Sequence, residues 1–112
     1  MRTFWKFPKK YFNAAELQKA VLPKLDYSYE DLEPVLSKDV VEIHHSKHHQ
    51  AYIDNFNRLI PLLNQAIING ETEKIVSLTK DIKFNGGSHI NHSIYWKNLA
   101  PIKSNMIYLI YY

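Results

Sequence analysis

The sequence predicts an all-α fold, an antiparallel two-helix hairpin preceded by an extended N-terminal arm. Three observations carry this prediction. Residues 22–34, LPKLDYSYEDLEP, hold a proline near each end, and proline fixes the backbone outside helical continuity. Residues 38–69 repeat apolar and histidine side chains at three- and four-residue steps, and a second such stripe ends just before Pro101. Two helices with inward stripes and a compact connection make a hairpin.

The composition limits the chemistry of the chain. Its 112 residues suit one small domain, and the absence of cysteine excludes disulfides and thiolate metal ligands. Any transition metal must therefore be held by nitrogen and oxygen. The net charge of +3 is mild, and we expect no nucleic-acid partner because no basic stripe with interleaved aromatics is present. No apolar run approaches the roughly 20 residues that span a bilayer, so we expect no membrane partner.

Residues 1–21 form a basic extension in which five lysines and arginines accompany only Glu16. Such a segment is typical of a mitochondrial transit peptide, or of a surface-exposed amphipathic extension. We expect residues 22–101 to form the hairpin domain. Residues 102–112 form an atypical apolar tail of β-prone, aggregation-prone character.

The first helix is expected to begin at Lys38, capped by Ser37, with Asp39 favouring its N-terminal end. Pro61 should kink this helix, and Asn69-Gly70 should end it. Its inward stripe is predicted to consist of Val41, His44, His48, Tyr52, Phe56, Leu59 and Leu63.

A short helical stretch is expected at residues 71–80. The second helix should follow Gly86 and Gly87, which weaken a helix and usually mark close approach of another backbone or a ligand. Its stripe consists of His89, His92, Trp96 and Leu99.

The strongest local signal is HHSKHH, residues 44–49. His44 and His48 share one helix face, and His45 and His49 form a second pair, predicted to be rotated outward by about 100°. A buried imidazole is costly unless both nitrogens are bonded, and a metal on one with an acceptor on the other satisfies both. With His92 on the facing helix, the pattern indicates a metal site. Core histidines bonded to polar neighbours, or a solvated histidine-rich helix, remain alternatives.

Imidazole ligands suit zinc, copper, iron and nickel, and together with carboxylate they suit manganese and non-haem iron. No acidic residue falls on the two inward stripes, because Asp54 and Glu42 lie off them. The hairpin thus predicts two or three nitrogen ligands and an incomplete ligand set.

Three segments, LPKLDYSYEDLEP, HHSKHHQAYIDNFN and KFNGGSHINHSIYWKNLAP, resemble the start, first helix and second helix of the iron/manganese superoxide dismutases. The resemblance covers residues 22–101, in the family's order and spacing. It implies the N-terminal hairpin domain of an oxidoreductase that converts superoxide to dioxygen and hydrogen peroxide, and a homo-oligomer in the full-length family.

Carried over by residue, the resemblance implies that His44 and His92 are metal ligands. It places His48 and Tyr52 at the substrate entrance, makes Trp96 an aromatic wall, and leaves His89 peripheral. Small residues at 86–88, where many iron enzymes carry glutamine, favour manganese as the cofactor, with iron as the alternative.

Two departures from the family stand out. Asp26 stands where the family usually has proline, and Pro101 is followed by IKSNMIYLIYY instead of the α/β domain that supplies an aspartate and a third histidine. We therefore expect a truncated chain, either a fragment, a splice form or a gene model that ran into non-coding sequence, with the change in composition favouring the last two. Such a chain should bind manganese poorly and have little dismutase activity by itself.

Two alternatives to an enzyme remain open. A non-catalytic isoform could dock on full-length dismutase subunits, or the hairpin could bind zinc through His44, His48 and His92. The basic extension favours the mitochondrial matrix, with the cytoplasm as the alternative. An apolar face left uncovered predicts marginal stability and self-association.

Overall fold

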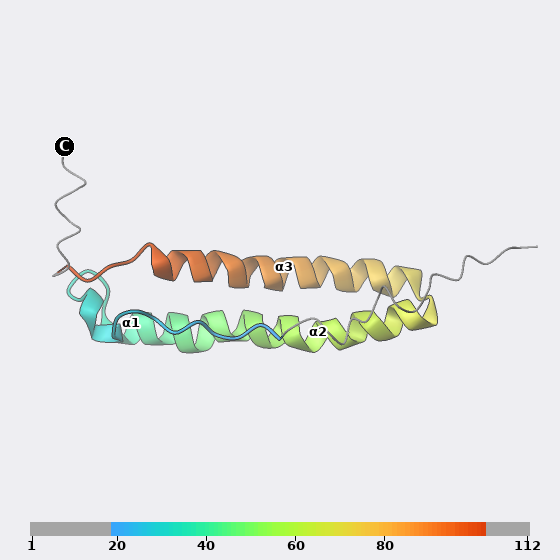
Figure 1. Ribbon diagram of the computed structural model, residues 1–112, viewed down its shortest axis with the longest axis horizontal. Helices are drawn as coiled ribbons and strands as arrows, with labels where there is room; N and C mark the ends of the chain where they lie inside the picture. The colour runs from blue at the N-terminus through green and yellow to red at the C-terminus, as the bar shows by residue number, and fades with distance from the viewer. Residues whose placement is uncertain (1–18, 103–112) are drawn as a thin grey trace, which may run out of the picture.

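Residues 19–102 of this computed structural model form two long helices lying side by side in opposite directions (Figure 1). The predicted all-α hairpin is confirmed. Residues 1–18 and 103–112 lie outside the described part of the chain, and with them most of the basic extension and nearly all of the apolar tail.

The first rod of the hairpin runs without a break through three segments. These are α1 (Lys38–Ile43), a π-helical segment η4 (His44–His49) and α2 (Gln50–Asn69). Ser37 occupies the N-cap position and Asp39 the first turn, as predicted. However, the backbone N–H of Lys38 donates to Glu33 Oε1 at 3.1 Å. The Ser37 side chain makes no capping hydrogen bond within the described residues.

The first rod ends where the sequence predicts. Gly70 has φ of +69°, and its N–H donates to the carbonyl oxygens of Ala66 and Ile67 in the last turn of α2. Glycine is the residue that adopts this left-handed conformation without steric cost. Pro61 lies inside α2, so this proline does not end the helix.

The second rod is one continuous helix, α3 (Thr72–Lys97). The predicted division into a stretch at 71–80 and a separate later helix is wrong, because α3 continues through Gly86 and Gly87. Packing against α2 along the hairpin outweighs the roughly 1 kcal/mol by which each glycine disfavours a helix.

The arm lies along the first rod, on one side of the hairpin (Figure 1). Asn57 of α2 holds its start, because its amide accepts from Ala20 N and donates to Ala20 O, each at 2.9 Å. Further along, the Tyr27 hydroxyl donates to Trp96 O at 2.8 Å. The arm is not extended throughout, since a short 3₁₀ turn, η3 (Tyr29–Leu32), forms where Asp31 accepts a hydrogen bond from Ser28 N.

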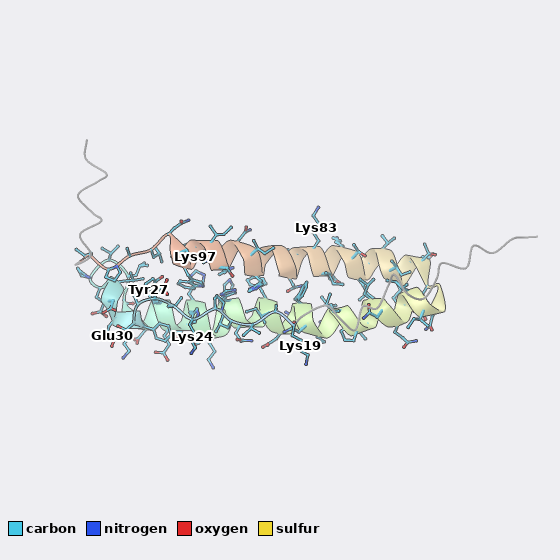
Figure 2. All side chains as sticks on the ribbon, in the orientation of Figure 1. Lys19, Lys24, Tyr27, Glu30, Lys83 and Lys97 are labelled. Carbon is cyan, nitrogen blue, oxygen red and sulfur yellow. The ribbon has the colours of Figure 1, made fainter. Side chains whose placement is uncertain are left out.

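Buried apolar side chains gather in two places. Leu32, Val41 and Trp96 pack together where the arm meets both helices, and Ile53, Leu59 and Ala66 continue along α2. Charged side chains such as Lys83 point away from the facing helix (Figure 2). Ile90 and Ile94 on α3 are more than half exposed, so they form an apolar patch on the outside of α3.

Candidate metal centre

The buried stripe of the first rod differs from the predicted one by one residue around HHSKHH. Val41, His45, His49 and Ile53 are buried, at four-residue steps, whereas His44 and Tyr52 are half-buried and His48 is exposed. The prediction that His45 and His49 point outward is therefore wrong. The physical reason is the π-helical segment. Its i→i+5 bonding places more residues in each turn than the α-helical period on which the prediction rests.

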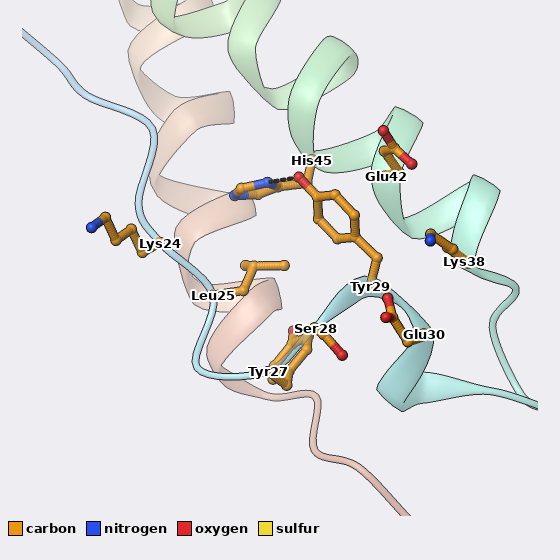
Figure 3. Close-up of a pocket in the computed structure, with 9 residues that line it drawn as sticks. All are labelled: Lys24, Leu25, Tyr27, Ser28, Tyr29, Glu30, Lys38, Glu42 and His45. Carbon is orange, nitrogen blue, oxygen red and sulfur yellow. Dashed lines mark hydrogen bonds between the residues drawn. The ribbon is translucent and has the colours of Figure 1, made fainter.

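His45 fastens the arm to the first rod. Its Nε2 lies 2.8 Å from Pro23 O, a carbonyl that can only accept, so Nε2 carries the proton. Its Nδ1 then accepts from the Tyr29 hydroxyl at 3.0 Å (Figure 3). Both nitrogens are bonded to the arm, which accounts for a buried imidazole that is no part of a metal group.

His49 is fully buried between the two helices. The Trp96 indole N–H donates to His49 Nδ1 at 3.1 Å, and His49 Nε2 lies 2.8 Å from His89 Nδ1. Its ring is stacked on that of His92, with centroids 5.1 Å apart and planes at 24°. His89, which the resemblance leaves peripheral, is half-buried and lies outside the candidate metal group, where it contacts the buried His49.

Three other imidazoles form the candidate metal group: His44, His48 and His92. One nitrogen of each lies within 4.8 Å of the others. The Nδ1 of His92 donates to Ser88 O at 2.7 Å, which leaves its Nε2 lone pair for a metal. The two helices therefore bring together the side chains that the sequence singled out.

The residues expected around the metal also lie here. Trp96 contacts the His44 ring edge-on with centroids 4.9 Å apart. The Tyr52 hydroxyl is 3.4 Å from His48 Nε2, and the Tyr52 ring lies 5.3 Å from that of His92. The aromatic wall is on the buried side of the group, and Tyr52 with His48 is on the exposed side.

Burial keeps several of these imidazoles neutral. It lowers the pKa of His44, with smaller contributions from His92, His48 and His45. It lowers the pKa of His49 to about 4, helped by His89 and His92, and it lowers the pKa of His89. Neutral imidazole is the form that donates a lone pair to a metal.

The donor set fits a transition-metal ion. Among residues 19–102 the candidate group consists of imidazoles alone, without a carboxylate. Glu42 is exposed, and exposed Asp54 accepts from Gln50 Nε2 at 2.7 Å. Three nitrogen donors suit zinc, copper, nickel and iron, and manganese prefers added oxygen ligands.

None of the helices in residues 19–102 has the length and apolar character needed to cross a bilayer.

Comparison with known proteins identifies the family of the hairpin. The family model for the alpha-hairpin domain of iron/manganese superoxide dismutases matches residues 19–100. The chain belongs to the iron/manganese superoxide dismutase family. The match contains both helices and every histidine of the cluster.

Individual relatives of this dismutase-family chain are close in sequence. Mitochondrial manganese superoxide dismutase 1 of Arabidopsis thaliana is 52% identical over 85 residues, which cover 76% of this chain and 37% of the relative. Mitochondrial manganese superoxide dismutases of Glossina morsitans morsitans and Capsicum annuum are each 48% identical, covering 81% and 78% of this chain. The chain spans 37%, 42% and 38% of the length of these three relatives.

The sequence interpretation missed one arrangement, the hydrogen bonds that join Trp96, His49 and His89. A signal for it was present. An unbroken series of four-residue steps joins Val41, His45, His49 and Ile53. It competes with the predicted stripe, which runs through His44 and His48 in steps of three and four residues. The helical period of 3.6 residues favours steps of three and four residues, so the sequence pattern predicts the stripe through His44 and His48.

Proposed function

We propose that this chain acts in the metal-dependent disproportionation of superoxide to dioxygen and hydrogen peroxide, with His44 and His92 as ligands of manganese. The observation that carries the proposal is the convergence of these two imidazoles from opposite helices. The manganese dismutases among its relatives, and the small residues at 86–88, support manganese over iron.

The first role of the chain's residues is to direct a nitrogen lone pair of His44 and one of His92 toward the same metal position. The bond from His92 Nδ1 to Ser88 O fixes its tautomer, and burial against Trp96 holds His44 neutral. Manganese held there would supply the alternation between two oxidation states that disproportionation requires.

The second role is to supply protons, because reducing superoxide to peroxide consumes two of them. The Tyr52 hydroxyl can donate its one proton to a bound anion while its oxygen accepts a hydrogen bond from His48 Nε2. His48 is exposed, so it can pass protons between Tyr52 and water. Trp96 closes the opposite, buried side against water.

We further propose that the 112-residue chain has little dismutase activity by itself, since the candidate group offers no carboxylate among the described residues. The family resemblance assigns an aspartate and a third histidine of the metal site to a second domain. A hairpin of this kind would act with such a domain or by docking on a dismutase subunit. The names of the relatives place the proposed function in mitochondria.

A hybrid enzyme tests the proposal. Residues 19–100 would replace the matching segment of the Arabidopsis thaliana relative, which is 52% identical over 85 residues. We expect a manganese-loaded hybrid with dismutase activity, and we expect His92→Ala to abolish it while the exposed substitution Asn55→Ala leaves it unchanged. A folded, manganese-loaded hybrid without activity would refute the proposal.

The geometry supports a second candidate, a zinc site formed by the hairpin alone. Its basis is that His48 brings a third nitrogen within 4.8 Å of the other two. Zinc binds three protein ligands plus water at many open sites. The His48→Ala variant separates the two candidates, because it should sharply weaken zinc binding but leave both proposed manganese ligands in place.

A further inference from the structure

A series of hydrogen bonds joins Trp96, His49 and His89 beside the candidate ligands. An indole N–H can only donate, so His49 Nδ1 must accept from Trp96. The proton of neutral His49 is therefore on Nε2, and this N–H donates to His89 Nδ1. The order of donation, from Trp96 to His49 to His89, follows from the chemistry of the first donor.

This series fixes the plane of the His49 ring. A ring bonded through both nitrogens cannot turn without breaking a hydrogen bond, and His49 has no exposed surface through which water could replace one. The ring thus presents a fixed flat face between the helices.

That flat face lies against His92. The two rings are nearly parallel, at 24°, with centroids 5.1 Å apart. On the other side of the series, Trp96 contacts the His44 ring at 4.9 Å. One indole therefore contacts one candidate ligand directly and orients, through His49, the surface on which the other ligand rests.

We propose that His49 is a positioning residue for the metal site, a buried imidazole locked by Trp96 and His89 whose face holds His92 in its ligating orientation. The Ser88 carbonyl selects the His92 tautomer, and His49 keeps the ring in the plane where that bond is made. Partners beyond the ligand commonly change metal affinity by about 10- to 100-fold when they are lost.

The proposal deepens the proposed function, since it assumes that His92 is a ligand, but its first test needs no metal. Nitrogen-15 NMR of the imidazoles in the metal-free, full-length chain reports each tautomer. We expect His49 protonated on Nε2 and His92 protonated on Nδ1. Finding His49 protonated on Nδ1 would overturn the proposal without any variant.

The variant test compares His49→Leu with His45→Leu. His45 is a matched control because it lies on the same π-helical segment, is buried, and is bonded through both nitrogens, yet its partners are Pro23 and Tyr29. In the metal-free chain, His49→Leu should convert His92 to a mixture of tautomers. His45→Leu should leave His92 as it is in the unaltered chain.

Titration with Co²⁺ supplies the second readout. We expect His49→Leu to raise the Kd about tenfold or more, and His45→Leu to stay within about twofold of the unaltered chain. Trp96→Phe keeps an aromatic side chain but removes the indole N–H. His49 should then be protonated on either nitrogen, and this result can be measured even if His49→Leu fails to fold.

The outcomes separate the two proposals. Equal effects of His49→Leu and His45→Leu on His92 would overturn the positioning role, because only general loss of stability would then be seen. A chain whose His92→Ala variant binds Co²⁺ as tightly as the unaltered chain would contradict the ligand assignment instead. The metal-free tautomers of His92 still decide whether His49 positions that ring.

Discussion

At the scale of single residues, burial lowers the pKa of His44, His49 and His89. The unfolded chain binds protons on ordinary imidazoles, whereas His49 in the fold has its pKa lowered to about 4 from 6.5. The lowered pKa values of His44 and His89 act in the same direction. The fold therefore binds fewer protons than the unfolded chain in mildly acidic solution, and its stability rises with pH there.

We predict that the metal-free chain loses stability as the pH falls from 6.5 towards 4, by up to about 3 kcal/mol from His49 alone. Urea unfolding at a series of pH values in the presence of a chelator measures this loss. His49→Leu should flatten the dependence in that window, and His45→Leu is the control. A stability that does not change between these pH values would contradict the burial argument.

Residue patterns predicted that the imidazoles of the candidate group lie close together, but not which histidines are buried. His44, His48 and His92 could be found because side chains at helical spacing on two facing helices must meet. The burial of His45 and His49 had only the series of four-residue steps as a signal, because the π-helical segment that produces it departs from the regular helical period. The partners of His45 lie on the arm, whose path alongside the first rod no local pattern specifies.

At the scale of helices, the adjacent glycines of α3 have different surroundings. A Cβ at Gly86 would lie 3.0 Å from Phe56 Cε2 and 3.1 Å from its Cδ2. At Gly87, nothing in the described part of the chain lies within 4 Å of such an atom. The expected close approach is thus real at Gly86, although the neighbour is a side chain of α2 rather than a backbone or a ligand.

We predict that Gly87→Ala stabilises the chain by about 0.5–1 kcal/mol, because alanine favours the helix and meets no obstacle. Gly86→Ala should be less stable than Gly87→Ala, since the half-buried Phe56 ring must move. Thermal unfolding followed by circular dichroism compares the two. Equal stability of both variants would show that Phe56 does not restrict residue 86.

The arm depends on Asn57 at its start. We predict that Asn57→Ala removes both hydrogen bonds to Ala20 and costs about 1 to 2 kcal/mol. The Ala20 amide should then exchange its hydrogen much faster, as measured by NMR. Asn55→Ala, an exposed position two residues away, is the control and should leave that amide protected. Unchanged exchange at Ala20 in Asn57→Ala would mean that the arm is held elsewhere.

At the scale of the whole molecule, the hairpin buries one side of each helix and leaves apolar side chains on the outside. Ile90 and Ile94, one turn apart on α3, are 58% and 53% exposed. We predict concentration-dependent self-association, measured by sedimentation velocity. Ile94→Lys should reduce it more than Val76→Lys, which removes a 66% exposed side chain at the other end of α3. A monomer at all concentrations would contradict this prediction.

We have proposed that His44 and His92 hold a transition metal between the two helices. An anomalous diffraction map, recorded at the cobalt edge from crystals of the chain grown with Co²⁺, is the most direct test. We expect a peak next to a nitrogen of His44 and to Nε2 of His92, on the Tyr52 side of Trp96. A peak on other residues, with no density between these two imidazoles, would contradict it.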